Sequence, residues 1–345
     1  MSFLHPIVFS TTGTASLGKR VCLELEKRLP KKFLPKKKRS IEGKATVDIF
    51  SNENMEVAVE NVRDHFVVVL HTQAPPVSDG LIESFALLDA IVEAKPAKTL
   101  LVFPYMPYSR SDRKNKPRIS VMAKRLAEFY NCYEGLRTLL VDPHDSHIKH
   151  YFKPTSDEIT AMYLLASNIK SLFKSKKVMI VFTDTGAAKK FEEVAHFLGL
   201  DVAYIDKRRN DNKEKPTIRK IIGDVKDQIC VLIDDEALTG GTTSMDAEAL
   251  YQDGAKEVAV AVIHPILMKK NAPNISVIKK LEDSCITKII VSNTVPIGKR
   301  LKEADAKKFI VVDSSPLIAE AIKRIICSES LSELHNPRNL KFYCK

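Results

Sequence analysis

The chain has 345 residues, of which 44% are hydrophobic and 28% are charged, and its formal net charge is +11 at pH 7. This length allows two domains of ordinary size, and the composition is that of a soluble globular chain rather than a disordered one. No apolar run is long enough to span a bilayer, and the N-terminus lacks the pattern of a secretion signal, so we expect a cytoplasmic protein without a membrane segment.

Cysteine spacing and net charge bear on the redox state of the protein and on its possible partners. The six cysteines are scattered, with neither a CxxC pair nor a cysteine–histidine cluster of zinc spacing, which indicates reduced thiols. The excess of 54 basic over 43 acidic residues suits nucleic acid, but it suits equally a site that gathers several phosphate groups. A nucleic-acid partner rests only on this excess and on the basic run at 31–39, and we do not expect one.

The first half of the chain alternates apolar runs with amphipathic stretches. Apolar runs predict strands that begin near residues 7, 66, 99 and 136, with helices between them. Residues 50–63 form a polar loop and an alternating segment, which fits either a hairpin or adjacent strands. The strand near residue 99 leads into an aromatic and arginine-rich loop, a type of loop that can hold a nucleotide base and its phosphates.

Histidines gather after the strand predicted near residue 136. His144, His147 and His150 fall close together, just beyond Asp142. A lone histidine at a strand end is usually structural, whereas three beside carboxylates fit a structural role and a site for a metal ion or a phosphate oxygen equally well. Both interpretations stay open at this point.

The second half keeps the alternation of strands and helices. A helix is predicted from about 157 to 173, and 178–200 is typical of a strand, a small-residue turn and a helix. The turn contains Asp184 and Gly186, and backbone amides at the start of the helix favour a phosphate. We expect parallel sheets covered on both faces by helices.

A basic stretch at 207–220 follows a further predicted strand. Few of its residues are apolar, which predicts either a mobile loop that folds over a triphosphate or a merely solvated one. Lys207 and Arg209 lie at its stem.

The most informative stretch is CVLIDDEALTGGTT at 230–243. A short apolar strand ends in Asp234 and Asp235, and a turn with two glycines and three hydroxyl side chains follows: Thr239, Gly240, Gly241, Thr242 and Thr243. Such a turn lets the backbone approach a phosphate, and the carboxylates can accept hydrogen bonds from ribose hydroxyls or hold a divalent metal through water. The alternative is an ordinary strand–turn–helix connection, and the combination favours a sugar phosphate site.

This stretch resembles the phosphoribosyl-diphosphate loop of type I phosphoribosyltransferases and of ribose-phosphate diphosphokinases. From about residue 7 to residue 334 the chain resembles the second family, whose motifs occur here in order. They are FSNEN, APPVSDGLIE, PYMPYSRSDRK, VDPHDSHIKHYF, TDTGAAKK, YIDKRR and VLIDDEALTGGTT. A phosphoribosyltransferase would need only the last loop, so the longer match separates the two families.

The resemblance implies a fold and a reaction. The fold is α/β, with two similar phosphoribosyltransferase-like domains, 1–155 with the ATP-site loops and 156–345 with the ribose-phosphate and pyrophosphate loops. Each is a mainly parallel sheet flanked by helices. The implied reaction moves the β,γ-diphosphate of Mg-ATP to the 1-hydroxyl of ribose 5-phosphate, giving phosphoribosyl diphosphate and AMP. It uses Mg²⁺, with ATP as a substrate, in a homo-oligomer that is a dimer or a hexamer.

The resemblance also assigns roles to single residues. It places Phe50 against adenine and assigns the rest of the ATP site to Asn52, Asn54, Arg110, Ser111 and Asp112. It assigns the diphosphate transfer to Lys207 and Arg209, and metal contact to His144 and Asp184. It gives the pyrophosphate loop to Asp184 and Gly186, the ribose hydroxyls to Asp234 and Asp235, and the 5′-phosphate to Thr239, Gly240, Gly241, Thr242 and Thr243.

Some positions depart from the family pattern. Leu238 stands where the family usually has aspartate, Ala187 replaces a glycine, and Ser111 replaces a glutamine. Asn52 and Asn54 replace acidic residues. These changes motivate two alternatives: the same transfer onto a larger ribose phosphate such as ADP-ribose, and a non-catalytic regulatory subunit.

Overall fold

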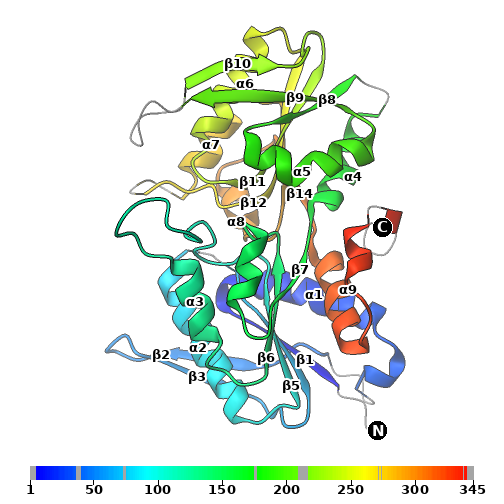
Figure 1. Cartoon of the computed structure of the whole chain (residues 1–345). Helices are drawn as coiled ribbons and strands as arrows, with labels where there is room; N and C mark the ends of the chain where they lie inside the picture. The colour runs from blue at the N-terminus through cyan, green and yellow to red at the C-terminus, as the bar shows by residue number, and fades with distance from the viewer. Residues whose placement is uncertain are drawn as a thin grey trace. The chain divides into compact units, whose positions relative to one another are not determined.

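The chain divides into two compact units, which Figure 1 shows in a computed structural model. Unit 1 comprises Met1–Thr160, Thr294–Pro296 and Ser314–Lys345, and unit 2 comprises Ala161–Asn293 and Ile297–Asp313. The structure describes residues 5–35, 40–72, 75–174, 177–208, 217–270, 272, 274–336 and 338–339.

Unit 1 contains a parallel sheet of five strands. In order of pairing they are β1 (Pro6–Ser10), β4 (Phe66–Leu70), β5 (Lys98–Phe103), β6 (Leu136–Val141) and β7 (Asp157–Ile159). Every residue of β4 is buried, as expected for an inner strand whose two faces are both covered. The described helices of this unit are α1 (Ala15–Arg28), α2 (Val77–Glu93), α3 (Met122–Tyr130) and α9 (Ser315–Cys327), with 3₁₀ turns η1 (Thr12–Thr14), η2 (Lys31–Phe33), η3 (Ser146–Tyr151) and η4 (Ser332–His335).

A separate hairpin decides between the two arrangements that residues 50–63 allowed. Strand β2 (Ala45–Ile49) pairs in antiparallel fashion with β3 (Met55–Val59), and β3 packs against α2. Of the two open interpretations, the hairpin is therefore the one that the structure confirms. Its tip carries Phe50, Asn52 and Asn54.

The two compact units differ from the predicted division of the chain in the placement of helix α9. The division at 155/156 placed the whole C-terminal part in the second domain, whereas α9 belongs to unit 1 and lies beside α1 (Figure 1). Most of α9 is buried, including Leu317 and Ile322, and Glu320 lies 3.8 Å from the Arg28 guanidinium of α1. Helix α9 therefore packs on α1 within unit 1.

Unit 2 contains a sheet of seven strands. In order of pairing they are β10 (Thr217–Ile222), β9 (Asp201–Arg208), β8 (Val178–Phe182), β11 (Ile229–Ala237), β12 (Glu257–Pro265), β13 (Lys288–Ser292) and β14 (Phe309–Val312). All neighbours are parallel except β9 and β10. The described helices are α4 (Met162–Leu172), α5 (Thr185–Leu198), α6 (Gly241–Gln252), α7 (Ser276–Glu282) and α8 (Gly298–Glu303). The predicted α/β class, with mainly parallel sheets flanked by helices, is confirmed.

Two segments differ from the sequence-based expectation. The helix expected from about residue 157 begins only at Met162, because Asp157–Ile159 pairs with the end of β6 as strand β7. The basic stretch 207–220 is partly strand, since β9 extends to Arg208 and β10 folds back on it. Arg209 lies outside the described residues. In the described ranges, no helix combines the length and the apolar character needed to cross a bilayer.

Candidate functional site

Two βα turns of unit 2 meet at one edge of its sheet. Strands β8 and β11 are neighbours and run parallel, with Phe182 opposite Ile233, so the turns that follow them lie at the same edge. The carboxyl edge of a parallel sheet is where ligands bind in open α/β folds. Asp184 ends the first turn as the N-cap of α5, Gly186 lies at the start of α5, and Asp234 and Asp235 lie near the end of β11.

The turn after β8 is closed by its own side chain. Asp184 is the N-cap of α5, and its Oδ1 accepts a hydrogen bond of 2.8 Å from the backbone N–H of Ala187. A carboxylate at this position is favoured by the positive end of the helix dipole. The methyl group of Ala187, which replaces a glycine of the family pattern, is buried.

The end of β11 holds two neighbouring carboxylates, Asp234 and Asp235. Asp234 accepts hydrogen bonds from the Thr183 hydroxyl at 3.3 Å and from the Asp235 backbone N–H at 2.9 Å. Lys190 of α5 lies 3.3 Å from Asp235 Oδ2. Burial, together with the charges of Asp235 and Asp184, raises the pKa of Asp234 to about 8. This excess of negative charge and of oxygen ligands fits a hard divalent cation such as Mg²⁺.

The turn after β11 is left open. Gly240 precedes α6 with φ of +63°, and among the described residues no side chain caps this helix. A Cβ at Gly240 would lie 2.9 Å from Leu281 Cδ2, so this position requires glycine in both conformation and space. The first amides of α6 therefore lack a side-chain cap among the described residues, and phosphate binding by the turn from Thr239 to Thr243 stays a prediction.

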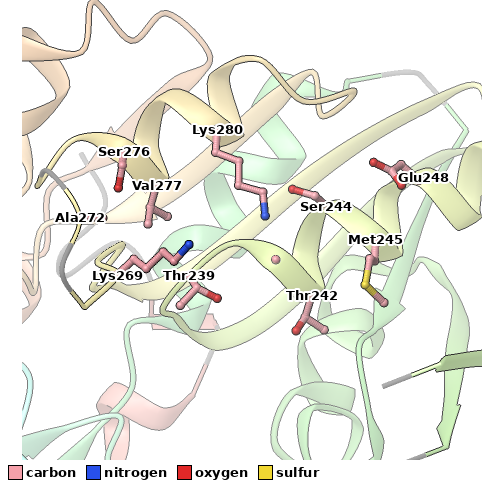
Figure 2. Close-up of a pocket in the computed structure, with 11 residues that line it drawn as sticks. Thr239, Thr242, Ser244, Met245, Glu248, Lys269, Ala272, Ser276, Val277 and Lys280 are labelled. Carbon is pink, nitrogen blue, oxygen red and sulfur yellow. The ribbon is translucent and has the colours of Figure 1, made fainter. Parts of the chain in front are cut away.

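A cavity of about 590 Å³ adjoins this turn. It is lined by Thr239, Gly241, Thr242, Ser244, Met245, Glu248, Lys269, Ala272, Ser276, Val277 and Lys280. Figure 2 shows the amines of Lys269 and Lys280 directed into this space from two different segments. The Lys280 Nζ lies 3.6 Å from where a Cβ of Gly241 would stand, which puts a positive charge next to the turn from Thr239 to Thr243, which we call the phosphate turn.

Lys207 is engaged in an ion pair within unit 2. Its Nζ lies 2.6 Å from Oδ2 of Asp246, whose side chain is only 1% exposed on α6. Burial raises the pKa of Asp246, and the Lys207 charge opposes that rise. The Lys207 amine, which is predicted to act on the diphosphate, is therefore held at α6. This helix begins within the phosphate turn.

Unit 1 carries the residues expected at the ATP site. Phe50 is 49% exposed at the tip of the β2–β3 hairpin, so its ring is available for stacking. Asn52 Oδ1 accepts a hydrogen bond of 3.2 Å from the Asn54 backbone N–H, which fixes the tip. Both asparagines are exposed.

The other residues predicted for the ATP site lie in the loop between β5 and α3. Arg110 is exposed, whereas Asp112 is 3% exposed. The Ser111 hydroxyl donates to the Ser120 carbonyl at 3.1 Å and accepts from the Met122 backbone N–H at 3.3 Å. Ser111 therefore closes the loop onto the start of α3.

His144 lies half-buried between β6 and η3 in unit 1, and Asp184 lies in unit 2. A metal ion shared by these two residues stays a prediction. Sequence reasoning left out Asp246, Lys269 and Lys280 from the site. Asp246 could have been predicted, because it lies about one and a half turns into the helix that begins at the glycine turn. Lys269 and Lys280 could not, because they lie in other segments and no local sequence pattern connects them to the turn.

Known proteins agree with this arrangement of motifs. The N-terminal domain of ribose phosphate pyrophosphokinase matches residues 7–132, and a phosphoribosyl synthetase-associated domain matches residues 203–336. The ribose-phosphate pyrophosphokinase of Xanthomonas campestris is 32% identical over 332 residues, covering 95% of this chain and 97% of that protein. That of Clostridium tetani is 33% identical, covering 85% and 89%.

A solved structure agrees as well. The crystal structure of phosphoribosylpyrophosphate synthetase from Mycobacterium smegmatis superposes with a TM-score of 0.81 at 26% identity, covering 94% of this chain and 99% of that one. With relatives above 30% identity along nearly the whole sequence, the chain belongs to the ribose-phosphate pyrophosphokinase family.

Proposed function

We propose that the protein transfers the β,γ-diphosphate of ATP to the 1-hydroxyl of ribose 5-phosphate, releasing phosphoribosyl diphosphate and AMP. The observation that carries the proposal is the edge of unit 2, where two carboxylates stand beside an uncapped glycine turn and a lysine-lined cavity. The names of the relatives, ribose-phosphate pyrophosphokinases, support the same reaction.

Ribose 5-phosphate would bind along this edge. The backbone amides and hydroxyls from Thr239 to Thr243 would hold the 5′-phosphate, and Asp234 and Asp235 would accept hydrogen bonds from the ribose hydroxyls. Leu238 removes a carboxylate that the family usually has at the turn, and Lys280 places a cation nearby. The Lys280 cation favours a doubly charged phosphate, whereas Leu238 is the departure that motivates ADP-ribose as the alternative acceptor.

The diphosphate would lie between the two turns. Asp184, Gly186 and Lys190 face it from the start of α5, and Lys207 and Arg209 would stabilise the charge that grows on the transferring group. In unit 1, Phe50, Asn52, Asn54, Arg110, Ser111 and Asp112 would bind ATP, and His144 would contact the metal.

The reaction is a displacement at the β-phosphorus. The 1-hydroxyl oxygen forms a bond to that phosphorus, the bond to the α,β-bridging oxygen breaks, and AMP leaves. The hydroxyl proton passes to solvent or to a nearby carboxylate. Holding the two substrates in line contributes much of the rate, and lysines contribute by neutralising developing charge. Asp184 and His144 would hold Mg²⁺, which would supply further neutralisation of charge and polarise the attacking hydroxyl.

The experiment is an AMP-release assay with Mg-ATP and three acceptor conditions: ribose 5-phosphate, ADP-ribose and none. We expect AMP that depends on ribose 5-phosphate. If AMP forms only with ADP-ribose, then ADP-ribose replaces ribose 5-phosphate as the proposed acceptor. If AMP forms in the reaction without an acceptor, the protein hydrolyses ATP. No AMP in any condition would leave a regulatory subunit as the better interpretation.

Family membership also supports a homo-oligomer, whose size sedimentation would measure. The cytoplasmic location stays a prediction.

A further inference from the structure

A second group of potential metal ligands lies in unit 1, apart from His144 and Asp184. It consists of Asp112, Asp145 and His147, and one ligand atom of each lies within 4.8 Å of the other two. Asp112 comes from the loop between β5 and α3, and the other two come from the start of η3. We call these three residues the loop–η3 cluster.

Asp112 is the first observation that points to a cation. It is 3% exposed, and its Oδ2 has no hydrogen-bond partner in the described part of the chain. The nearest nitrogen atoms of ionisable side chains are His147 Nε2 at 3.5 Å and Arg113 Nε at 3.8 Å, both too far for a short hydrogen bond. A buried carboxylate oxygen without a donor is costly unless a cation approaches it.

The orientation of His147 is the second observation. Its Nδ1 lies 2.8 Å from Asp145 Oδ1, and its Nε2 lies 3.1 Å from the Tyr151 hydroxyl. That hydroxyl donates its proton to the Asp112 carbonyl oxygen at 2.7 Å, so it turns lone pairs toward Nε2. When Nδ1 carries the ring proton toward Asp145, the Nε2 lone pair faces both the Tyr151 oxygen and Asp112 Oδ2.

Three electron-rich atoms therefore converge on one point, which requires either a proton on Nε2 or a metal ion. A carboxylate bonded to the far nitrogen of a histidine is the usual support of a metal-binding imidazole. The Nε2 to Oδ2 distance of 3.5 Å suits two ligands on one ion, each at about 2.1 Å. Arg113, 67% exposed and 3.8 Å from both carboxylates, is free to turn toward solvent when the ion enters.

We propose that Asp112 and His147 bind a divalent transition-metal ion, with Asp145 holding the imidazole through Nδ1. An imidazole nitrogen among the ligands favours ions such as Zn²⁺, Co²⁺ or Mn²⁺ over Mg²⁺ and Ca²⁺, which prefer oxygen ligands throughout. The ion would fasten the β5–α3 loop, which carries Arg110 and Ser111, to η3. The inference concerns binding by the free protein and does not depend on the proposed reaction.

The test is a Co²⁺ titration of the full chain after chelator treatment, without nucleotide, followed by visible absorption and calorimetry. We expect one tight Co²⁺ site per chain, displaced by Zn²⁺. The variants His147→Gln and Asp145→Asn should weaken it by about 10- to 100-fold. Asparagine also caps helices well, so Asp145→Asn removes the charge and keeps η3.

Two controls locate the site. His150→Gln changes an exposed histidine of the same 3₁₀ turn and should leave the titration unchanged. His144→Gln removes the histidine expected at the catalytic metal and should also retain the Co²⁺ band. Equal Co²⁺ binding by the parent protein and both cluster variants would overturn the proposal, as would no tight binding by the parent protein. Circular dichroism confirms that each variant is folded.

Discussion

The corresponding edges of the two sheets differ in how their polar groups are satisfied. At the ends of β1 and β4 in unit 1, Thr11 Oγ1 lies 2.9 Å from Thr14 Oγ1 and 3.1 Å from His71 Nδ1. The Thr72 backbone N–H donates to Thr14 at 3.1 Å. All four residues are buried. Apart from His71 Nε2, which has no hydrogen-bond partner among the described residues, this edge is closed by bonds among its own groups.

At the ends of β8 and β11 in unit 2, burial and the charges of Asp235 and Asp184 raise the pKa of Asp234 instead. Gly240 leaves the next helix without a capping side chain among the described residues. Polar groups that bond to one another stabilise the fold, whereas the crowded carboxylates and uncapped amides of an open edge remain available to a ligand. Binding sites are commonly less stable for this reason.

The largest expected effect concerns the Lys207–Asp246 pair at the open edge. Lys207→Ala leaves a buried carboxylate without its partner, which should lower the free energy of unfolding by about 3 to 5 kcal/mol. Asp246→Asn added to it removes the stranded charge and should restore most of that stability. Urea unfolding of the single and double variants measures both. AMP release should stay low in the double variant, because Lys207 is still missing; full recovery would exclude a role for Lys207 in transfer.

The closed edge should give a pH-dependent stability through His71. Burial lowers the pKa of His71 to about 4, below its ordinary value of 6.5. Its stabilisation is therefore complete above pH 6.5 and is lost as the pH falls toward 4, a change of about 3 kcal/mol. His71→Leu should remove this dependence, and Thr11 keeps Thr14 as a partner. Urea unfolding of both proteins at several pH values measures the difference; parallel pH profiles would contradict it.

Two adjacent glycines of the phosphate turn allow a matched pair. Gly240→Ala forces a side chain into positive φ and toward Leu281, which should cost about 1 to 2 kcal/mol and raise KM for ribose 5-phosphate. Gly241→Ala meets its nearest neighbour at 3.6 Å and should fold normally, with a higher KM alone. Thermal unfolding and kinetics of both variants separate the effects. Equal stability of the two variants would contradict the role of Gly240.

The turn after β8 should show the smallest effect on stability. Asp184→Ala removes the cap of α5 and should cost about 1 kcal/mol, whereas Asp184→Ser keeps a capping oxygen and should cost little. Both lose the carboxylate that is proposed to contact metal and diphosphate, so both should lose AMP release. Activity in the serine variant would show that Asp184 serves the helix alone.

Much of this fold follows from sequence periodicity, because buried parallel strands are continuous apolar runs such as residues 66–70. The glycine turn at 239–243 could also be predicted, because the residues that form it are adjacent in the sequence. The position of α9 was not, because an apolar helix face does not specify the partner on which it packs. Lys280 was missed for the same reason: it reaches the turn from another helix, through tertiary structure alone.

The most direct measurement is ³¹P NMR of a mixture of the protein, Mg-ATP and ribose 5-phosphate. The account predicts that a diphosphate on C1 of the ribose and AMP appear in equal amounts, and that ADP does not form. Transfer of the γ-phosphate alone, giving ADP and a ribose bisphosphate, would contradict it.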